Sequence, residues 1–289
     1  MTTRRILVAV MAFVVAVPVL ATTAGAAGRS ATSPTIAAVR ERGTLVVGTK
    51  FDQPLFGVRD PATGVMSGFD VEIARIVARR VFGSTIARNL RFVETPSKTR
   101  ESALTTGAVD LVVATYSITP ERDAVVDFAG PYSTSGQSLL TRSADTSIGG
   151  VDDLAGRRVC TVNGSTSATV LAAKAPTALP VLLDTYSACV AALQAGSVDA
   201  VTTDEGILLG YVATDPSGLR LAGRPFTTEY YGIGIAQGDR VLARKIDAAL
   251  TASFEDGTWR RAWKRTIGTS GAPVPDPPTR ALRRAAAAV

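Results

Sequence analysis

One thirteen-residue pattern occurs twice in the chain and constrains its fold more than any other feature. Residues 103–115 read ALTTGAVDLVVAT and residues 192–204 read ALQAGSVDAVTTD, with Ala, Leu, Gly, Val, Asp and Val shared. Each copy predicts the end of a helix, a glycine cap and a strand. The repeat therefore indicates two similar α/β halves, although a G-x-V-D junction between a helix and a strand also arises by chance.

The segments around the first copy alternate between strand and helix patterns. Strands are predicted at 44–49, 90–95 and 109–115, and helices at 68–83 and 98–107. The helix at 68–83 is amphipathic, because Phe69, Ile73, Ile76 and Val77 share one face. This βαβαβ order predicts a mostly parallel sheet.

The second half repeats this order and then closes the fold. A strand is predicted at 156–162, and the stretch NGSTS (163–167) begins a helix. After the second copy of the repeat come two extended stretches within 218–236 and a pair of helices within 240–268. In open α/β sheets ligands bind at the carboxyl ends of the strands. The two copies therefore deliver Thr115 and Asp204 to one shared cleft.

Composition excludes several classes of function. The 289 residues are 46% hydrophobic and 19% charged, as in an ordinary globular protein, and none is histidine. Histidine general bases, Ser-His-Asp and Cys-His nucleophile systems and histidine metal ligands are therefore excluded. The formal net charge of +6 comes from basic residues scattered among acids, so we expect no nucleic-acid binding.

The N-terminal residues resemble a secretory signal peptide. Arg4 and Arg5 precede an apolar run at 6–20, and Ala24-Gly25-Ala26 fits a cleavage site. The alternative is an uncleaved anchor, but the run is shorter than the ~20 residues that span a bilayer. Cleavage would remove two arginines and leave a net charge of 6 − 2 = +4. No cysteine follows the run, so we expect no lipid attachment.

The two cysteines, Cys160 and Cys189, are predicted to form a disulfide. An even number of cysteines in an exported chain favours a bond, and the alternative is two buried thiols. A disulfide that closes the loop from Cys160 to Cys189 would stabilise the fold by about 3 kcal/mol. Two cysteines alone make a poor metal site, and no metal or cofactor is expected.

The stretch SITPER (117–122) predicts an anion site. Thr119 is a good N-cap and Pro120 suits the first helical position, so a helix begins at this point. Arg122 adds a planar fork that can grip a carboxylate, and Ser117 can donate a further hydrogen bond. The alternative is that Arg122 pairs on the surface with an acid nearby in sequence.

Two features of the second half could complete such a site. Ser165 and Thr166 lie at a helix start, where free N–H groups hold anions. Asp204 follows a strand and could bind an ammonium group. For all three residues the alternative is helix capping, which every helix needs.

Other candidate site residues lie in the first half. Lys50 and Arg100 are cations near the edges of predicted elements, with solvation as the alternative. Phe51, Tyr116 and Tyr132 could supply apolar walls, with core packing as the alternative.

Taken together, these stretches resemble the extracellular solute-binding proteins of family 3, which are the polar amino-acid receptors of bacterial ABC importers. The resemblance covers about residues 40–267 and is most specific in ITPER…VDFAGPY followed by G-x-VDAVTTD. VGTKFDQP and VATYSITPER look most like the glutamate-binding receptors of actinobacteria. The implied fold is α/β and periplasmic-binding-protein-like, type II, with two α/β lobes of mostly parallel sheets joined by a two-strand hinge.

The resemblance also implies a domain layout. It comprises a signal peptide (1–26), a flexible N-terminal segment (27–40), lobe 1 (41–138 plus 228–268), lobe 2 (139–227) and a disordered tail (269–289).

The resemblance implies a role for each candidate residue. Arg122 would hold the ligand α-carboxylate with Ser117 and the Thr115 backbone, and Ser165 and Thr166 would complete that site. Asp204 would take the α-ammonium. Many family members carry an acid where this chain has Lys50, and receptors for acidic amino acids carry an arginine at the position of Arg100.

These substitutions favour glutamate or aspartate as the ligand. Three cations, Arg122, Lys50 and Arg100, oppose one acid, Asp204, and a ligand with two carboxylates would offset the excess. The remaining residues that the resemblance implies at the site, Phe51 and Tyr116, would line it.

The predicted function is an extracytoplasmic receptor that delivers an acidic amino acid to the transmembrane subunits of an ABC permease, acts as a monomer and catalyses no reaction. One alternative is a ligand-presenting sensor protein for a membrane kinase. Another is a lyase or dehydratase on the same fold.

Overall fold

Three sheets organise the protein. The structure is a computed structural model, and it describes residues 32–278. The first sheet has the order β5 (Leu90–Glu94), β1 (Leu45–Thr49), β6 (Leu111–Ser117), β13 (Glu229–Ile235) and β7 (Asp127–Ser135). The second has the order β10 (Leu179–Leu183), β9 (Arg158–Val162), β11 (Ala200–Asp204), β8 (Gln137–Arg142) and β12 (Leu219–Ala222). A small third sheet comprises β2 (Asp52–Gln53), β3 (Gly57–Arg59) and β4 (Met66–Ser67).

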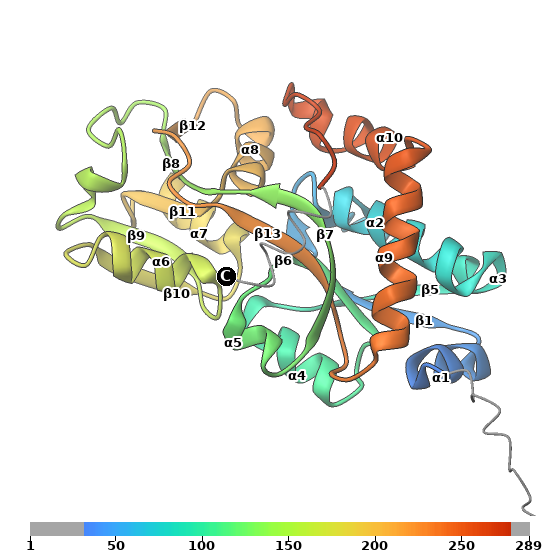
Figure 1. The fold of residues 1–289 in the computed structure, drawn as a ribbon. Coiled ribbons are helices and arrows are strands. Elements are labelled where there is room, and N and C mark those ends of the chain that lie inside the picture. The colour runs from blue at the N-terminus through green and yellow to red at the C-terminus, as the bar shows by residue number, and fades with distance from the viewer. Residues whose placement is uncertain (1–31, 279–289) are drawn as a thin grey trace, which may run out of the picture. The chain divides into compact units, whose positions relative to one another are not determined.

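The two large sheets share one connectivity. In each, three strands pair in parallel and the last two pairings are antiparallel, so four of the five strands point the same way. In each, the reversed strand is the one that enters from the other sheet, β13 in the first and β8 in the second. Figure 1 shows β7 leading into β8 and β13 returning. The expected two-lobed α/β fold with two connecting strands is confirmed, with mixed sheets.

Helices cover these sheets. The principal helices are α1 (Pro34–Arg42), α2 (Phe69–Val77), α3 (Ser84–Arg88), α4 (Arg100–Thr105), α5 (Pro120–Asp123), α6 (Thr166–Lys174), α7 (Tyr186–Gln194), α8 (Glu205–Thr214), α9 (Arg240–Glu255) and α10 (Thr258–Arg265). A π-helical turn at Ala78–Phe82 extends α2, and shorter 3-10 turns lie at Ser97–Thr99, Val151–Leu154 and Ile267–Ser270. The four apolar residues predicted to share a face of α2 are all buried.

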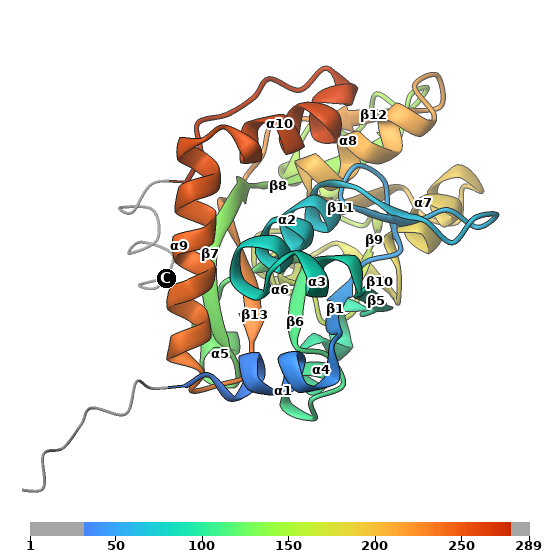
Figure 2. The same cartoon turned by 90° about the vertical axis from the view of Figure 1, so that its right-hand side faces the viewer.

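The C-terminal helix pair closes the first lobe, as predicted. α9 lies along β7 in both views (Figures 1 and 2). On α10, Trp259 and Trp263 make edge-to-face contacts with the Phe69 ring, and Trp259 Nε1 donates to the Tyr132 carbonyl (2.8 Å). Burying these large rings stabilises the lobe and ties its last helix to its first sheet.

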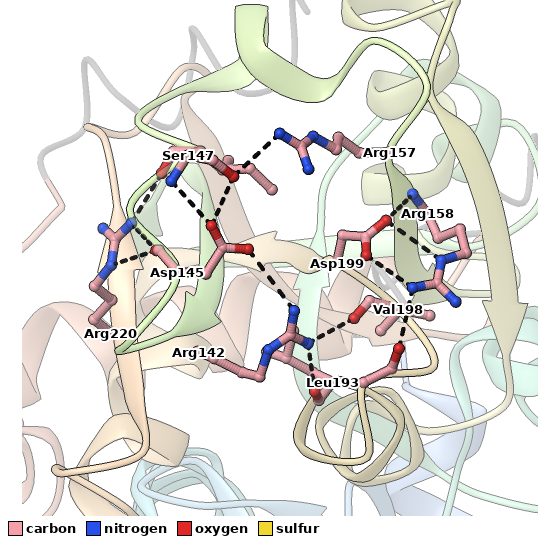
Figure 3. Close-up of polar contacts among 11 residues, drawn as sticks. Arg142, Asp145, Ser147, Arg157, Arg158, Leu193, Val198, Asp199 and Arg220 are labelled. Atoms are coloured by element: carbon pink, nitrogen blue, oxygen red, sulfur yellow. Dashed lines mark hydrogen bonds and ion pairs between the residues drawn. The ribbon is translucent and has the colours of Figure 1, made fainter.

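The repeat found in the sequence performs the same structural task in both lobes. Gly107 and Gly196 end α4 and α7 with φ of 71° and 72°, values that favour glycine. Asp110 Oδ2 then accepts from the N–H of Val46 at the start of β1 (2.8 Å). Asp199 Oδ2 accepts from the N–H of Arg158 at the start of β9 (2.8 Å), as Figure 3 shows. Each copy therefore fixes the start of the parallel strand that pairs with its own strand, β1 beside β6 and β9 beside β11.

Arginines reinforce the second copy. Arg142 Nη1 donates to the carbonyls of Leu193 (2.7 Å), in the last turn of α7, and Val198 (2.9 Å), just before β11 (Figure 3). The Arg158 guanidinium also pairs with Asp199 (2.9 Å). These contacts satisfy backbone groups and hold the amino end of the second sheet together.

The predicted disulfide between Cys160 and Cys189 is confirmed. Their Cα atoms are 5.5 Å apart and both residues are fully buried. The bond ties α7 to β9 and therefore stiffens the second lobe below its strand ends.

Both terminal predictions need correction. α1 begins at Pro34, so the segment 27–40 is not flexible beyond Ser33, whose hydroxyl oxygen accepts from the Ile36 N–H (3.0 Å). At the other end, Ala272 and Val274 pack against the core, so the predicted tail is ordered up to residue 278. The predicted signal peptide and residues 279–289 lie outside the described residues. Among residues 32–278, no helix has the length and apolarity needed to span a bilayer.

Candidate functional site

The turn that carries Arg122 forms as the sequence predicts. Pro120 begins α5, and the Thr119 hydroxyl oxygen accepts a hydrogen bond from the Arg122 N–H (3.3 Å). The Arg122 side chain is buried. Its Nη1 donates to the Ser117 carbonyl (2.7 Å) and its Nη2 donates to the Gly164 carbonyl (3.2 Å). Since Gly164 follows β9 of the second sheet, Arg122 reaches across to the other lobe.

Arg100 lies beside Arg122 at the start of α4. Its guanidinium donates to the carbonyls of Ser97 (3.3 Å), Ala114 (3.3 Å) and Gly164 (3.5 Å). Burial, and then the nearby charge of Arg122, lower the pKa of Arg100 to about 10, so it stays a cation at neutral pH. The alternative of a solvated surface arginine is wrong, because its exposed fraction is 3%.

Gly164 is a point of close approach between the lobes. Its φ is +74°, and a Cβ at this position would lie 2.7 Å from Lys98 Cα, closer than real contacts come. Only glycine therefore allows its carbonyl oxygen to meet both guanidinium groups. The NGSTS turn contributes a backbone oxygen to the site as well as hydroxyl groups.

Tyr116 lies beneath the two arginines. The guanidinium carbons of Arg100 and Arg122 are 4.2 and 5.0 Å from its ring centroid. Its hydroxyl donates to Glu101 (2.7 Å), and Glu101 forms an ion pair with Arg122 Nε (3.5 Å). Arg122 therefore pairs with this acid rather than with an acid of its own turn. Tyr116 itself is fully buried and supports the site from below instead of lining it.

Asp204 ends β11 and faces the arginines from the second lobe. Its Oδ2 accepts a hydrogen bond from the Tyr231 hydroxyl, whereas its Oδ1 is buried and finds no hydrogen-bond donor among residues 32–278. Burial, and then the charge of Glu229, raise the pKa of Asp204 to about 7. Asp204 occupies the N-cap position of α8 but makes no capping bond, so the capping alternative is not realised.

Ser165 and Thr166 differ in how far their hydroxyls are committed. The Ser165 hydroxyl donates to the Val162 carbonyl (2.6 Å) and accepts from the Ala168 N–H (3.2 Å), so it caps α6. The Thr166 hydroxyl lies 3.5 Å from that of Ser117, across the boundary between the lobes. Thr166 is therefore the freer of the two for a ligand.

A narrow cavity between the lobes, with a volume of about 10 Å³, collects most of these groups. It is lined by Ser97, Arg100, Thr115, Ser117, Ser165, Thr166, Ser167, Tyr186, Thr203, Asp204 and Ile207. Arg122 lines a larger neighbouring hollow of about 550 Å³, and Ser165 and Thr166 line both spaces. Six of the ten predicted ligand-binding residues thus meet at one cavity, with Arg122 at its border.

Lys50 and Phe51 lie in an adjoining pocket. Lys50 Nζ donates to the Ser97 hydroxyl (2.9 Å), and Ser97 also lines the central cavity. Burial, and then the charge of Arg100, hold the pKa of Lys50 well below its ordinary value. The Phe51 ring is half-buried under the Arg59 guanidinium (5.7 Å) and does not line the central cavity.

Comparisons with known proteins identify the family. The sequence pattern of the bacterial extracellular solute-binding proteins, family 3, matches residues 45–269. The chain belongs to this family. It is 38% identical over 244 residues to the glutamine-binding protein GlnH of an ABC transporter from Bacillus subtilis, covering 84% of this chain and 88% of that one. It is 39% identical over 251 residues to the glutamate-binding protein GluB from Corynebacterium efficiens, covering 84% and 85%.

Solved structures of family 3 relatives share the fold. An ancestral arginine-binding protein bound to glutamine superposes with a TM-score of 0.73 at 34% identity, covering 78% of this chain and 99% of the other. The chain is therefore a solute-binding protein of an amino-acid ABC transporter and not an enzyme. Its membership of an extracellular family places its work outside the cytoplasm.

One residue at the site of this family 3 protein, Asp70, was not predicted from the sequence. Asp70 is fully buried, and its carboxylate accepts from the Thr115 N–H (2.8 Å) and the Tyr132 hydroxyl (2.6 Å). The Thr115 N–H, expected to help a ligand carboxylate, is thus already used, and Thr115 sits in the left-handed region with φ 46°. An acid in the first turn of α2 gave no sign of this role, because such acids usually just complement the helix dipole.

Asp70 changes the charge balance expected for this receptor. Burial raises the pKa of Asp70 to about 7, and the cations Lys50 and Arg100 act against this rise. The three cations of the site therefore face two buried carboxyl groups, Asp70 and Asp204. The excess of positive charge at the site is therefore smaller than the sequence predicted, because that prediction set the three cations against Asp204 alone.

Proposed function

We propose that this receptor captures an acidic amino acid, glutamate before aspartate, between its lobes and delivers it to an ABC permease. The observation that carries the proposal is the pairing of opposite walls. Two buried guanidinium groups lie on the first lobe, and on the second lies a carboxylate with a buried oxygen that has no hydrogen-bond partner in the described part of the chain. A zwitterion bound between them would satisfy both.

Each end of the ligand has a fitting partner. Arg122, with the hydroxyls of Ser117 and Thr166, would bind the α-carboxylate, and Asp204 would accept hydrogen bonds from the α-ammonium. Arg100 would bind the side-chain carboxylate. Lys50, whose Nζ donates to the Ser97 hydroxyl, would add to the positive potential at that end of the cavity. Ser165 would contribute through its helix start rather than its hydroxyl.

Glutamate suits this wall better than glutamine. A side-chain amide cannot neutralise a buried guanidinium, and leaving a buried cation unpaired is costly. The relatives do not decide the matter, because one is a glutamine-binding and another a glutamate-binding protein. The preference therefore rests on Arg100 and Lys50.

Delivery would depend on closure of two lobes, which we place at 41–138 plus 228–268 and at 139–227. The lobes also touch away from the cavity. Asp52 Oδ2 accepts from the Ser187 N–H (3.1 Å), and the Tyr211 hydroxyl donates to the Asp52 carbonyl (2.7 Å). Ligand binding would favour the closed form over the open one, and the closed form would dock on the permease.

The experiment is a binding panel on the mature protein. Thermal shift with the twenty amino acids, followed by calorimetry, should give glutamate as the tightest ligand, aspartate next and glutamine at least about tenfold weaker. Lys50→Met should reduce the glutamate-to-glutamine ratio by about three- to tenfold. Lys174→Met, at an exposed position on α6, should leave the ratio unchanged. Equal or tighter binding of glutamine by the wild type would overturn the proposal.

A further inference from the structure

The strand that carries Tyr116 separates the residues of the site into two faces. Thr115 and Ser117 line the central cavity, whereas Tyr116 between them does not, because successive side chains of β6 point to opposite faces. The Tyr116 ring is fully buried and lies under Arg100 and Arg122. Two cations from different helices thus share one aromatic ring.

This arrangement counters the repulsion between the two guanidinium groups. The negative face of an aromatic ring attracts cations, and Arg is its most frequent partner. Glu101 accepts a hydrogen bond from the Tyr116 hydroxyl (2.7 Å) and lies 3.5 Å from Arg122 Nε. Its carboxylate therefore adds negative charge beside the two arginines. Both arginines are thereby held in place by groups of the protein itself.

The ring itself is firmly fixed. The Phe128 ring meets it edge to face with centroids 4.8 Å apart. Behind it, a Cβ on Gly234 would lie 2.9 Å from Tyr116 Cε1, so only a glycine fits there. A ring so tightly packed can set the positions of the groups that lie on it.

We propose that Tyr116 is a positioning residue that holds Arg100 and Arg122 as a prealigned pair, and that this pair selects ligands with two carboxylates. The selectivity part rests on the proposed function. Arginine side chains lose much rotamer freedom when they are fixed, and a prealigned pair has met that cost before the ligand arrives. A ligand with two carboxylates gains from both arginines, whereas a ligand with one gains from Arg122 alone.

The test replaces the ring with a smaller aliphatic side chain and compares this with a variant that keeps the ring. Tyr116→Met removes the aromatic face, Tyr116→Phe keeps the ring but loses the bond to Glu101, and Tyr116→Leu serves if the Met variant does not fold. The control is Phe128→Leu, because Phe128 contacts Tyr116 in the same cluster of packed residues. Affinities for glutamate and glutamine are measured by calorimetry, alongside melting temperature.

Tyr116→Met should weaken glutamate binding by about ten- to hundredfold and reduce the glutamate-to-glutamine ratio by about tenfold. Tyr116→Phe should change either by less than about threefold, and Phe128→Leu should lower the melting temperature without changing the ratio. Equal losses for both ligands in Tyr116→Met, or an equal change of ratio in Phe128→Leu, would reduce Tyr116 to a packing residue. If the wild type prefers another amino acid, the proposed function fails. The positioning role is then tested by the affinity for that ligand in Tyr116→Met against Phe128→Leu.

Discussion

β6 and β11 occupy equivalent places in the two lobes, but the residues near their carboxyl ends make different contacts. Below them the chain is nearly the same. A left-handed glycine ends the helix in each lobe, and an aspartate, Asp110 or Asp199, accepts from an N–H at the start of the neighbouring parallel strand, β1 or β9. Near the tips the two differ, because the Thr115 N–H donates to Asp70 whereas one buried oxygen of Asp204 has no hydrogen-bond partner among residues 32–278. The strand starts therefore make matching contacts in the two lobes, and the strand ends do not.

The two walls also differ in how their charges are supported. The cations of the first lobe rest on Tyr116 and Glu101, and they share backbone oxygens as acceptors. Within residues 32–278 the Asp204 carboxylate accepts one hydrogen bond, from the Tyr231 hydroxyl on β13, which belongs to the first sheet. The charges of the first wall are therefore supported by several groups of the protein, whereas under the proposed function the ligand ammonium would be the second partner of Asp204.

Removing the first wall's main cation should have the largest effect. Arg122→Ala should weaken amino-acid binding by about a hundredfold or more, because charge-assisted hydrogen bonds contribute about 1.5–3 kcal/mol each and a bidentate pair makes two. The fold should survive, as judged by the melting temperature of the ligand-free protein. Calorimetry makes the measurement, with Arg158→Ala, a change at the exposed amino end of β9, as the control. A dissociation constant within threefold of wild type would show that Arg122 does not bind the ligand.

Neutralising the second wall should have a smaller effect that depends on pH. Asp204→Asn should weaken binding by about ten- to hundredfold at pH 8, because the ligand ammonium loses a charged acceptor. The wild-type protein must deprotonate Asp204 to bind the ammonium, and its pKa is about 7. Wild-type affinity should therefore fall as pH drops below 7, and the two proteins should converge near pH 5. A constant ratio between pH 5 and pH 8 would contradict this role.

The same substitution should stabilise the ligand-free protein at high pH. The pKa of Asp204 is raised from 3.8 to about 7, so the folded state keeps a proton that the unfolded state has lost, and stability declines from about pH 4 to pH 7. Asp204→Asn removes this decline and should raise the free energy of unfolding at pH 8 by about 1–3 kcal/mol. Urea unfolding at pH 5 and pH 8 measures it. Asp70 titrates in the same direction in both proteins, so its contribution cancels.

The matched aspartates should give the smallest effects and the sharpest comparison. Asp110→Ala and Asp199→Ala should each lower the free energy of unfolding by about 1–2 kcal/mol, because each frees a backbone N–H at a strand start. Affinity should change by less than about threefold in both. Urea unfolding and calorimetry on the pair check this. If one substitution lowers the free energy of unfolding several times more than the other, the two copies of the repeat are similar in sequence but do not stabilise their lobes equally.

The sequence predicted what depends on local pattern. The repeat located the end of β11 at Asp204 but placed the end of β6 at Thr115, two residues before the strand ends at Ser117. Thr119 and Pro120 marked the start of α5, and two cysteines in a chain expected to be exported indicated the disulfide. α1 also had its markers in Ser33, Pro34 and the left-handed Gly43, and the prediction overlooked them.

The remaining features depend on contacts between distant segments. Asp70 is understood only when α2 is seen beside the end of β6, 45 residues away in sequence. The support of two arginines by Tyr116 likewise needs α4, α5 and β6 together. Alternation along β6 does place Tyr116 opposite Thr115 and Ser117, but it cannot say which charges lie on that side.

The crossing of the chain between its lobes has a consequence for biogenesis. β13 lies in the interior of the first sheet, between β6 and β7, yet it begins 229 − 135 = 94 residues after β7 ends. A nascent or truncated chain that stops before Glu229 lacks an inner strand, so its first domain cannot mature until nearly the whole polypeptide has emerged. The first sheet is therefore completed only after the segment that forms the second sheet has been made.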